Sequence, residues 1–344
     1  MRGCRYGRSV CPGTGPIGED MKHVSWAVAG GAAGYWAARL AGADRFRIIE
    51  APAAPLMSFT PHVAAGALAG SLLLQPSGAA ATAAVTGAAL TAMVLPRTIR
   101  RRQPQAGGQV LRVLTANLLA GWASAEAVVG LVRRKHADVL FLQELTETAA
   151  ARLRQAGLTD LLPYQTTDVT GRRRPGSGIF ARFPLSSGLC LSPVPVAQPT
   201  ARLELPAGQH AELVCVHPHP PNGRPWRLRV TRWREELAVL PPPGDPPRVV
   251  AGDFNATADH AQFRRLLRMG HVDAAAQLGG GLIPTWGPGG RPALLTLDHV
   301  LVDPRCAVLA ASVHRLPGSD HRAVYAEFRL PAPRTAPLPT ARKE

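Results

Sequence analysis

The sequence predicts an α/β domain preceded by transmembrane helices, and three observations support this fold class. No Asp, Glu, Lys or Arg occurs between Glu50 and Arg97, a run long enough to cross a membrane. From about Val110 to Leu330, strand-like segments alternate with helix-like ones, which is the pattern of an α/β sheet. A polar residue follows strand after strand in that region. The length of 344 residues is consistent with two such units.

The chain begins with a polar, glycine-rich stretch without periodicity, residues 1–20. We expect it to be disordered, or to precede the true start of the protein, which would then be Met21. The segment Val24–Ala38 carries no charge and predicts a first membrane helix that continues to about Ala41. Arg39 lies close enough to the end of this helix for its side chain to reach the membrane surface.

The uncharged run after Glu50 is too long for one membrane helix and is divided by the turn signal Gln75-Pro76-Ser77-Gly78. We therefore predict two further membrane helices, at about Leu56–Leu74 and Ala79–Leu95. Their small residues would let helices pack closely in lipid. The membrane region, residues 21–102, would then hold two to three transmembrane helices. A buried helical hairpin of a soluble protein is the alternative, although it would lack a polar face for water.

Arginines bear on the orientation of this region in the membrane. Several of them lie within Arg97–Arg102, and a flexible linker, residues 103–109, follows. The positive-inside rule would keep this cluster, with Arg45 and Arg47, in the cytoplasm. The domain that follows would then be cytoplasmic as well.

The α/β domain, residues 110–331, is divided into elements by its hydrophobic periodicity. Apolar and β-branched runs predict strands at Val110–Thr115, Val139–Leu142, Gly178–Arg182, Ala211–Val216, Val249–Ala251, Leu297–Val302 and Ala323–Phe328. Helical spacing predicts helices at Ala125–Lys135, Thr146–Ala156, Arg227–Leu240 and Ala261–Met269, with Thr146 as a cap. The Pro-rich residues 332–344 predict a disordered tail.

One stretch of this domain, Val249–Asn255, combines a buried strand with polar ligands. Its apolar strand runs into Gly252, and Asp253 and Asn255 follow two positions apart. On a strand, such residues point to the same side and can reach one ligand together. A carboxylate beside an amide suits a phosphate held on a divalent cation, whereas an Asx turn is the structural alternative.

Similar polar residues lie at strand ends or in the adjoining loops throughout the domain. In α/β sheets these edges are where ligands bind. Each residue alone could belong to a solvated loop or a turn, but together they predict one site. The set comprises Asn117, Glu144, His217, Asp253, Asn255, Asp298, Asp320 and His321.

The net charge of +16 and the pI of about 11.0 favour a polyanionic partner, such as nucleic acid, anionic lipid or a phosphorylated substrate. Of the 39 basic residues only Lys22, Lys135 and Lys343 are lysine. An arginine excess of this kind also fits codon bias, so part of the charge need not be a binding surface.

The five cysteines form no CxxC pair, which argues against a zinc knuckle. Cys190 and Cys215 lie in apolar, strand-like runs and could form a disulfide. Two buried thiols are the interpretation we favour.

Six motifs occur in a family-typical order. They are Leu114-Thr-Ala-Asn117, Gln143-Glu144, His217-Pro-His219, Gly252-Asp-Phe-Asn255, Leu297-Asp-His299 and Gly318-Ser-Asp-His321. This ordered set resembles the endonuclease/exonuclease/phosphatase superfamily of DNase I-like nucleases, neutral sphingomyelinases and inositol-phosphate phosphatases. The resemblance covers about Val110–Leu330. It implies a four-layered α/β sandwich, with two sheets packed face to face and helices outside.

The resemblance also implies the metal-binding and water-positioning residues. Glu144 resembles the main Mg²⁺ ligand, with Asn117 beside it and Asp320 next to the metal, and Mn²⁺ could take the place of Mg²⁺. Asp253 and Asn255 resemble the pair that positions the attacking water and the phosphate. Phosphoryl transfer needs residues of these chemical types, because it requires a bound cation, an oriented water and hydrogen-bond donors for the developing charge.

Two histidines complete the implied set. His217 resembles the residue that stabilises or protonates groups around the scissile phosphate, and His321 resembles the general base or phosphate-binding histidine. Asp298 would orient His321, because a carboxylate behind an imidazole fixes its tautomer. His219 and His299 lie next to motif positions and could simply pack.

Substrate-binding candidates are Arg173 and Arg174, in the loop 171–176, and Trp286. The basic loop could hold a polyphosphate or DNA backbone, or could be a solvated charge run. Trp286 could contact substrate or pack in the core. No protein partner is inferred.

Membrane helices joined to such a domain resemble a bacterial subgroup of VanJ-type, teicoplanin-resistance-like membrane proteins. The resemblance implies a multi-pass cell-membrane protein with an extracytoplasmic domain, which departs from the arginine distribution. It also implies a phosphohydrolase that acts on a phosphoester or pyrophosphate of a lipid-linked cell-wall intermediate, such as undecaprenyl pyrophosphate. A membrane-associated endonuclease and a sphingomyelinase-like phosphodiesterase are the alternatives.

Overall fold

The computed structural model describes residues 16–46, 50–74, 77–169, 175–188, 191 and 198–333. The chain divides into two compact units. Met1–Ala41 and Thr60–Met93 make a helical unit, and Gly42–Phe59 and Val94–Glu344 make a larger α/β unit. The segment Gly42–Phe59, which the sequence places in the membrane region, thus belongs to the α/β unit.

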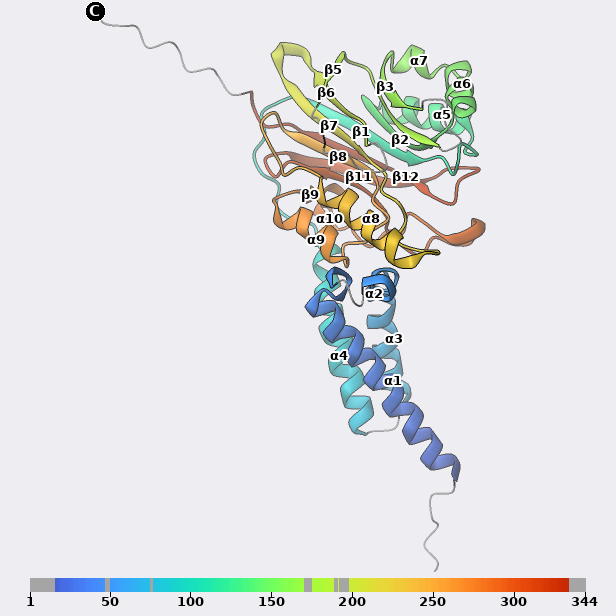
Figure 1. The fold of residues 1–344 in the computed structure, drawn as a ribbon. Helices are drawn as coiled ribbons and strands as arrows, with labels where there is room; N and C mark the ends of the chain where they lie inside the picture. The colour runs from blue at the N-terminus through green and yellow to red at the C-terminus, as the bar shows by residue number, and fades with distance from the viewer. Residues whose placement is uncertain are drawn as a thin grey trace, which may run out of the picture. The chain divides into compact units, whose positions relative to one another are not determined.

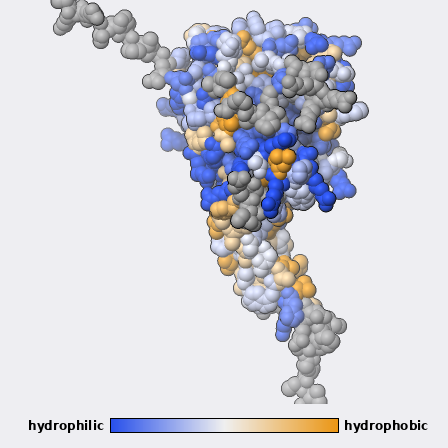
Figure 2. Space-filling view, viewed as in Figure 1, coloured by the Kyte–Doolittle hydropathy of each residue, from blue (hydrophilic) through white to orange (hydrophobic). Residues whose placement is uncertain are grey.

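The helical unit consists of α1 (Pro16–Ala41), α3 (Thr60–Leu73) and α4 (Gly78–Val94). Small residues let these helices approach closely. A Cβ on Gly87 of α4 would lie 2.8 Å from Cγ of Leu68 on α3, so this contact requires glycine. Tyr35 and Thr60 join α1 to α3 through hydroxyl groups 3.0 Å apart. The described surface of this unit is pale to orange in Figure 2, as its composition of alanine and other apolar residues requires.

Only one helical stretch within the described residues, Gly78–Arg97, is long and apolar enough to cross a membrane. The core helix of a soluble protein can meet the same criterion. The predicted span Leu56–Leu74 is interrupted at Ser58 and Phe59, and α3 has 14 residues. At about 1.5 Å per residue, α3 covers roughly 21 Å of a hydrocarbon core that is about 30 Å thick.

The α/β unit contains two six-stranded sheets, with the orders β11-β12-β1-β2-β4-β3 and β5-β6-β7-β8-β10-β9. The strands of the first sheet are β1 (Val110–Asn117), β2 (Val139–Leu145), β3 (Tyr164–Asp168), β4 (Gly176–Ala181), β11 (Ala307–Arg315) and β12 (Arg322–Arg329). Those of the second are β5 (Leu185–Ser187), β6 (Thr200–Glu204), β7 (His210–Val216), β8 (Arg248–Asp253), β9 (Val272–Asp273) and β10 (Asp298–Val302). Each sheet has a parallel pair, β1 with β2 and β7 with β8.

Three buried clusters hold this unit together in four layers (Figure 1). Side chains such as Phe141 and Val249 fill the space between the sheets. A second cluster lies between the first sheet and α5 (Ala125–Lys135), α6 (Glu147–Gln155) and α7 (Leu158–Leu161). A third lies between the second sheet and α8 (Trp226–Ala238) and α9 (Ala261–Arg268). The predicted two-sheet α/β fold is confirmed.

The segment Gly42–Phe59 is built into this unit through η1 (Ala43–Arg45) and α2 (Glu50–Met57). Oδ2 of Asp44 accepts a hydrogen bond from the Ala261 N–H at the start of α9, with a distance of 2.6 Å. His260 lies 2.7 Å from the Ala54 carbonyl oxygen, and Ala54 is buried in the cluster beneath α8. The described segment is therefore part of the domain core rather than a free loop.

Smaller elements complete the unit: η2 (Leu95–Arg97), η3 (Pro206–Gly208), α10 (Ala274–Gln277) and η4 (Pro288–Gly290). Cys215 and Cys306 are buried free thiols. Cys190, the other half of the alternative disulfide, lies outside the described residues, as do the predicted basic loop residues Arg173 and Arg174 and residues 334–344 of the predicted tail.

Candidate active site

The site residues collect where the two sheets present the ends of their central strands. Asn117 ends β1 and lies opposite Gln143 in the parallel pair with β2. Asp253 ends β8 and lies directly opposite Asp298, the first residue of β10. His217 follows β7 and His321 precedes β12. The parallel pairs β1–β2 and β7–β8 and the antiparallel pairs β8–β10 and β1–β12 thus bring residues far apart in sequence to one edge.

Glu144 reaches this edge because β2 is irregular there. The register between β2 and β4 shifts between Gln143 and Leu145, and Glu144 has a φ of 53°, in the left-handed region. Its Oε2 accepts a hydrogen bond from the Ala120 N–H at 2.6 Å, and its Oε1 lies 3.3 Å from Nδ2 of Asn117. The bulge directs the carboxylate out of the sheet and toward the site.

Asn117 joins the two sheets. Its Nδ2 also donates to Oδ2 of Asp253 at 3.0 Å, across the sheet interface. Its Oδ1 accepts from the Leu119 N–H at 2.9 Å, so the amide is fixed in orientation. Glu144 of one sheet and Asp253 of the other are thus held by the same side chain.

Asp253 and Asn255 form a turn, which corrects the expectation that both lie on a strand. The strand β8 ends at Asp253, and Asn255 has a φ of 49°. Oδ1 of Asp253 accepts from the Asn255 N–H at 2.8 Å, and Nδ2 of Asn255 donates to the Pro218 carbonyl at 3.1 Å. The Asx turn directs Asn255 toward the loop that carries His217.

His321 is held between two aspartates. Its Nδ1 lies 2.9 Å from Oδ2 of Asp298, and its Nε2 lies 3.6 Å from Oδ2 of Asp253. Thr285 anchors Asp298 by accepting its backbone N–H at 3.0 Å. Ser319 donates to the Asn117 carbonyl and accepts the His321 N–H, so the loop before β12 is fixed against β1.

The charges of this group depend on one another. Burial alone would lower the pKa of His321, but the Asp298 and Asp253 carboxylates outweigh it and raise that pKa to about 10. Burial raises the pKa of Asp253, and the His321 charge opposes this shift. This raised pKa favours the imidazolium form of His321, in which Nδ1–H donates to Asp298 and Nε2–H is directed toward Asp253.

Two other predicted residues lie near this group with different partners. Nε2 of His217 is 3.8 Å from Oε1 of Glu144, which places His217 on the Glu144 side of the site. Oδ2 of Asp320 accepts from the Trp286 indole N–H at 2.9 Å. Trp286 also forms an isolated β-bridge with His321. Asp320 and Trp286 thus make a pair beside His321.

The neighbouring histidines have structural partners. The His219 backbone N–H and Nδ1 both contact the buried Glu236 carboxylate, at 2.7 and 2.8 Å. Nδ1 of His299 lies 2.6 Å from Oδ2 of Asp273, inside the core. Glu236 lies seventeen positions from His219 on another element, so no local motif signals its role.

The donors present fit a divalent cation. Carboxylate and amide oxygens are the ligands that Mg²⁺ and Mn²⁺ prefer. Asp253, Asp298 and His321 have donor atoms within 4.8 Å of one another. The carboxylates of Glu144 and Asp253 are the oxygen donors that would hold a cation, whereas Asn117 directs its Nδ2 toward both of them and its Oδ1 toward the Leu119 N–H. Oδ1 of Asp298 and of Asp320 have no hydrogen-bond partner among the described residues.

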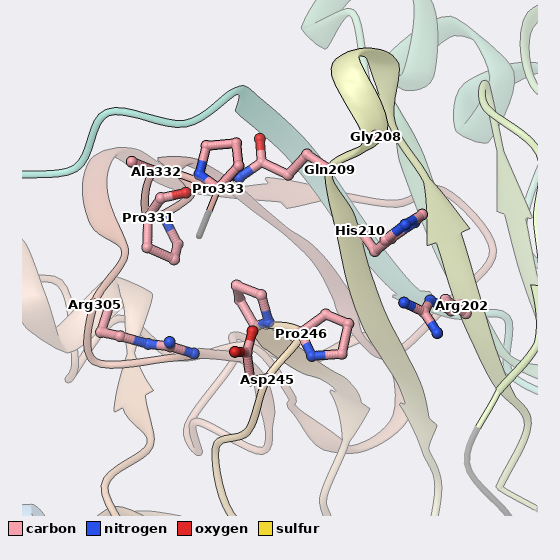
Figure 3. Close-up of a pocket in the computed structure, with 11 residues that line it drawn as sticks. Arg202, Gly208, Gln209, His210, Asp245, Pro246, Arg305, Pro331, Ala332 and Pro333 are labelled. Carbon is pink, nitrogen blue, oxygen red and sulfur yellow. Dashed lines mark hydrogen bonds between the residues drawn. The ribbon is translucent and has the colours of Figure 1, made fainter. Parts of the chain in front are cut away.

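A cavity of about 310 Å³ lies elsewhere in the unit (Figure 3). Its walls include His210 at the start of β7, Asp245 before β8 and Arg305 after β10. These are the strand ends opposite those that carry His217, Asp253 and Asp298. No predicted site residue lines this cavity.

Solved structures share this fold. An endonuclease/exonuclease/phosphatase from Beutenbergia cavernae is 20% identical, with a TM-score of 0.52, and the match covers 65% of this chain and 72% of that one. A D. rerio TDP2 humanized by 14 mutations is 19% identical, with a TM-score of 0.51, covering 64% of this chain and 99% of that one. At such identity the likeness is one of fold. No curated protein matches the chain.

The sequence itself matches a family over the same region. Residues 114–321, more than half of the chain, match the Endonuclease/Exonuclease/phosphatase family. The matched segment runs from the strand that carries Asn117 to His321, so it spans both sheets and the whole residue group described above. The chain therefore belongs to the Endonuclease/Exonuclease/phosphatase family and is a metal-dependent phosphoester hydrolase.

Proposed function

We propose that the protein is a membrane-anchored, Mg²⁺-dependent phosphohydrolase that cleaves a phosphoester or pyrophosphate of a lipid-linked cell-wall intermediate. The observation that carries the hydrolytic part is the network of Glu144, Asn117, Asp253, His321 and Asp298. It supplies oxygen ligands and a buried imidazolium within one hydrogen-bonded group. A divalent cation, when bound by the carboxylates of Glu144 and Asp253, would act as a Lewis acid on the phosphoryl oxygens, and Asn117 would hold these two carboxylates together.

The protein side chains activate the water, bind the phosphate and hold one another in position. Asp253 accepts a proton from the attacking water. At the same time, the water oxygen bonds to phosphorus and the P–O bond to the leaving group breaks. The imidazolium of His321 binds a phosphoryl oxygen, because its raised pKa keeps it a donor. His217, which lies near Glu144, and Asn255, in the turn with Asp253, position the phosphate. Asp298 is a positioning residue that holds the ring of His321.

The membrane part of the proposal rests on Gly78–Arg97 and on the uncharged run that contains it. The resemblance to teicoplanin-resistance-like membrane proteins favours an extracytoplasmic α/β unit and a polyprenyl pyrophosphate substrate. The arginines of Arg97–Arg102 favour the opposite orientation. Labelling of single cysteines in intact cells distinguishes these two orientations.

A nuclease is the second candidate, because the net charge of +16 suits a nucleic-acid backbone. It would nick supercoiled DNA, and the rate would fall steeply with salt as counterions compete for the arginines. A lipid phosphohydrolase in detergent would depend much less on salt.

Phosphate release by the purified full chain in detergent with Mg²⁺ distinguishes these candidates. Undecaprenyl pyrophosphate and supercoiled DNA are offered side by side, with Asp253→Ala as the inactive variant and the exposed Asp160→Asn as a matched control. Phosphate from the lipid, lost in Asp253→Ala and kept in Asp160→Asn, supports the proposal. Nicked DNA without lipid turnover supports the nuclease, and activity that persists in EDTA contradicts both.

A further inference from the structure

A group of large apolar side chains is exposed on one part of the α/β unit. Each of them is between 45% and 55% exposed, and such side chains are informative where they gather on one surface. They come from the segment around η1, from the residues after α4, from the start of α8 and from the loop before Trp286. They are Phe46, Leu95, Ile99, Trp226, Leu228 and Ile283.

Contacts within the α/β unit bring these segments together. The Gly281 N–H donates to the Arg97 carbonyl at 3.0 Å, which places the loop of Ile283 against the residues after α4. The Arg97 guanidinium binds the Asp259 carboxylate through two hydrogen bonds, of 2.7 and 2.6 Å, just before α9. Helix α9 contacts η1, and α2 packs on α8 (Figure 1). We call this surface the apolar–arginine face.

The same surface carries exposed arginines. Arg45 lies over the Phe46 ring, with its guanidinium carbon 5.0 Å from the ring centroid. Further exposed arginines on these segments are Arg100, Arg101, Arg102, Arg224 and Arg227. The described acids of the same region, Asp44 and Asp259, are buried and hydrogen-bonded. In Figure 2, orange side chains stand among strongly hydrophilic blue ones on the visible side of this unit.

We propose that the apolar–arginine face lies on an anionic lipid bilayer. Apolar side chains interspersed with arginines are the composition that binds a membrane interface, the former in the acyl boundary and the latter at the headgroups. The chain also joins this face to the apolar helices at two places. Only Ser58 and Phe59 separate α2 from α3, and Leu95 follows α4 directly. This inference rests on the membrane part of the proposed function.

The face adjoins the site through two loops. Pro218, whose carbonyl accepts the hydrogen bond from Nδ2 of Asn255, starts the loop that leads through the exposed residues 222–225 into the exposed start of α8. Ile283 precedes Thr285, whose hydroxyl accepts the Asp298 N–H. A bilayer contact at Trp226, Leu228 and Ile283 therefore brings the edge with His217 and Asp298 to the headgroup level. A phosphate attached to a membrane lipid is presented at that level.

Accessibility of a spin label tests the contact without any turnover. The full chain is placed in nanodiscs that contain phosphatidylglycerol, with Cys4, Cys11 and Cys190 replaced and the buried Cys215 and Cys306 kept. Labels at Ile283→Cys and Leu228→Cys are compared with one at Tyr164→Cys. Tyr164 is exposed on β3, at the far side of the α/β unit from α2 in Figure 1.

Labels on the face should be relaxed more by lipid-dissolved oxygen than by an aqueous nickel chelate, and the label at residue 164 should show the reverse. Equal ratios of relaxation by oxygen to relaxation by the nickel chelate at residues 283, 228 and 164 would overturn the proposal. A label that prefers the nickel chelate at residue 283 would do the same.

Kinetics separate this proposal from the proposed function. Trp226→Ser with Leu228→Ser should lower the turnover of a phospholipid-embedded pyrophosphate about tenfold, as loss of interfacial burial predicts, while a soluble nitrophenyl phosphodiester is cleaved within about twofold of wild type. No turnover of either substrate by wild type contradicts the proposed function, and the label results then decide the face alone. An unchanged rate on the lipid in the double variant contradicts the face.

Discussion

Three residues of the site have backbone conformations that few side chains adopt. Glu144 and Asn255 lie in the left-handed region, and Gly252 has a φ of 153°. Glu144 is fixed there by the β-bulge, and Asn255 by the Asx turn with Asp253. The first two conformations direct the polar side chains of Glu144 and Asn255 to the same edge, and Gly252 directly precedes Asp253 there; backbone strain tends to collect at such sites in enzymes.

Gly252 is the residue whose replacement should damage the fold most directly. A Cβ at this position would lie 2.0 Å from the Val216 carbonyl oxygen, in the backbone of β7. We expect Gly252→Ala to lower the free energy of unfolding by about 3 kcal/mol or more, through overpacking and backbone strain together. Thermal unfolding of the full chain in detergent measures this.

Gly130 provides the matched control for that substitution. It lies inside α5, and a Cβ there would meet only the flexible end of Arg134. Gly130→Ala should therefore stabilise the protein by up to about 1 kcal/mol through helix propensity. Equal melting temperatures for the two variants would contradict the role given to Gly252.

Asp298 should control the protonation of His321. Its carboxylate raises the pKa of His321, so Asp298→Asn should lower that pKa. If the imidazolium binds the phosphate, activity is present below this pKa and is lost as the pH rises through it. In the variant, the alkaline limb of the pH–rate profile should therefore move to lower pH, and the maximal rate should fall about 10²-fold or more. An alkaline limb at the wild-type position would show that His321 is not the donor.

The site shows what a sequence can and cannot indicate at this scale. Asp253, Asp298 and His321 follow apolar strands inside short motifs, so their presence at one edge could be predicted. The supporting residues could not be predicted. Thr285 accepts the backbone N–H groups of Leu297 and Asp298 from another segment, and Glu236 holds the neighbouring His219 from α8, so neither forms a local motif with its partner. The Asx turn at Asn255 was the alternative to a strand, and only packing between β7 and β8 decides between them.

At the scale of elements, the amphipathic helices and buried strands match their predictions closely. The helix Ala125–Lys135 has the predicted ends, and Thr146 caps α6 by accepting the Ala149 N–H. The strands β3, β5, β6, β9 and β11 were not predicted. All of them except β6 are edge strands, and β3 and β5 are polar and partly exposed. In β6, burial alternates regularly over Thr200–Glu204, but the prediction did not use this short pattern. Edge strands are specified by their neighbours more than by their own residues.

The packing of α2 against the rest of the α/β unit should weaken in acid. Burial lowers the pKa of His260, although the Asp44 and Asp259 carboxylates oppose the shift. Nδ1 of His260 accepts the Thr257 N–H, so the neutral ring donates from Nε2 to the Ala54 carbonyl. Because the folded pKa is depressed below the ordinary 6.5, this contribution to stability is present above that pH and is lost as the pH falls through the folded pKa.

Hydrogen exchange of the α2 amides measures this effect. Protection of the amides of Ala54, Leu56 and Met57 should decrease between pH 7 and pH 5, after correction for intrinsic exchange, while the amides of α5 keep their protection. His260→Gln, which cannot be protonated, should remove the pH dependence. Equal protection of α2 at both pH values in wild type would contradict the assignment.

At the scale of the whole chain, the division into units limits how the helices can cross a membrane. The α/β unit contains both Gly42–Phe59 and the chain from Val94 onward. The intervening residues 60–93 leave this unit and return to it. If α4 crosses the bilayer, α3 must cross it as well, although α3 is short, and a short span can be accommodated by local thinning of the bilayer. The sequence predicted two spans here, but it could not show that the chain before α3 and the chain after α4 both belong to the α/β unit.

Labelling of single cysteines in cells tests this arrangement. Ser77, between α3 and α4, should lie on the opposite side of the membrane from Tyr164 of the α/β unit. With the native cysteines Cys4, Cys11 and Cys190 replaced, a membrane-impermeant maleimide should label Tyr164→Cys in intact cells if the α/β unit is extracytoplasmic, and Ser77→Cys only after lysis. The reverse pattern would keep the pair of spans and place the α/β unit in the cytoplasm, as the arginines favour. Labelling of both sites from one side would show that α3 and α4 do not cross the membrane.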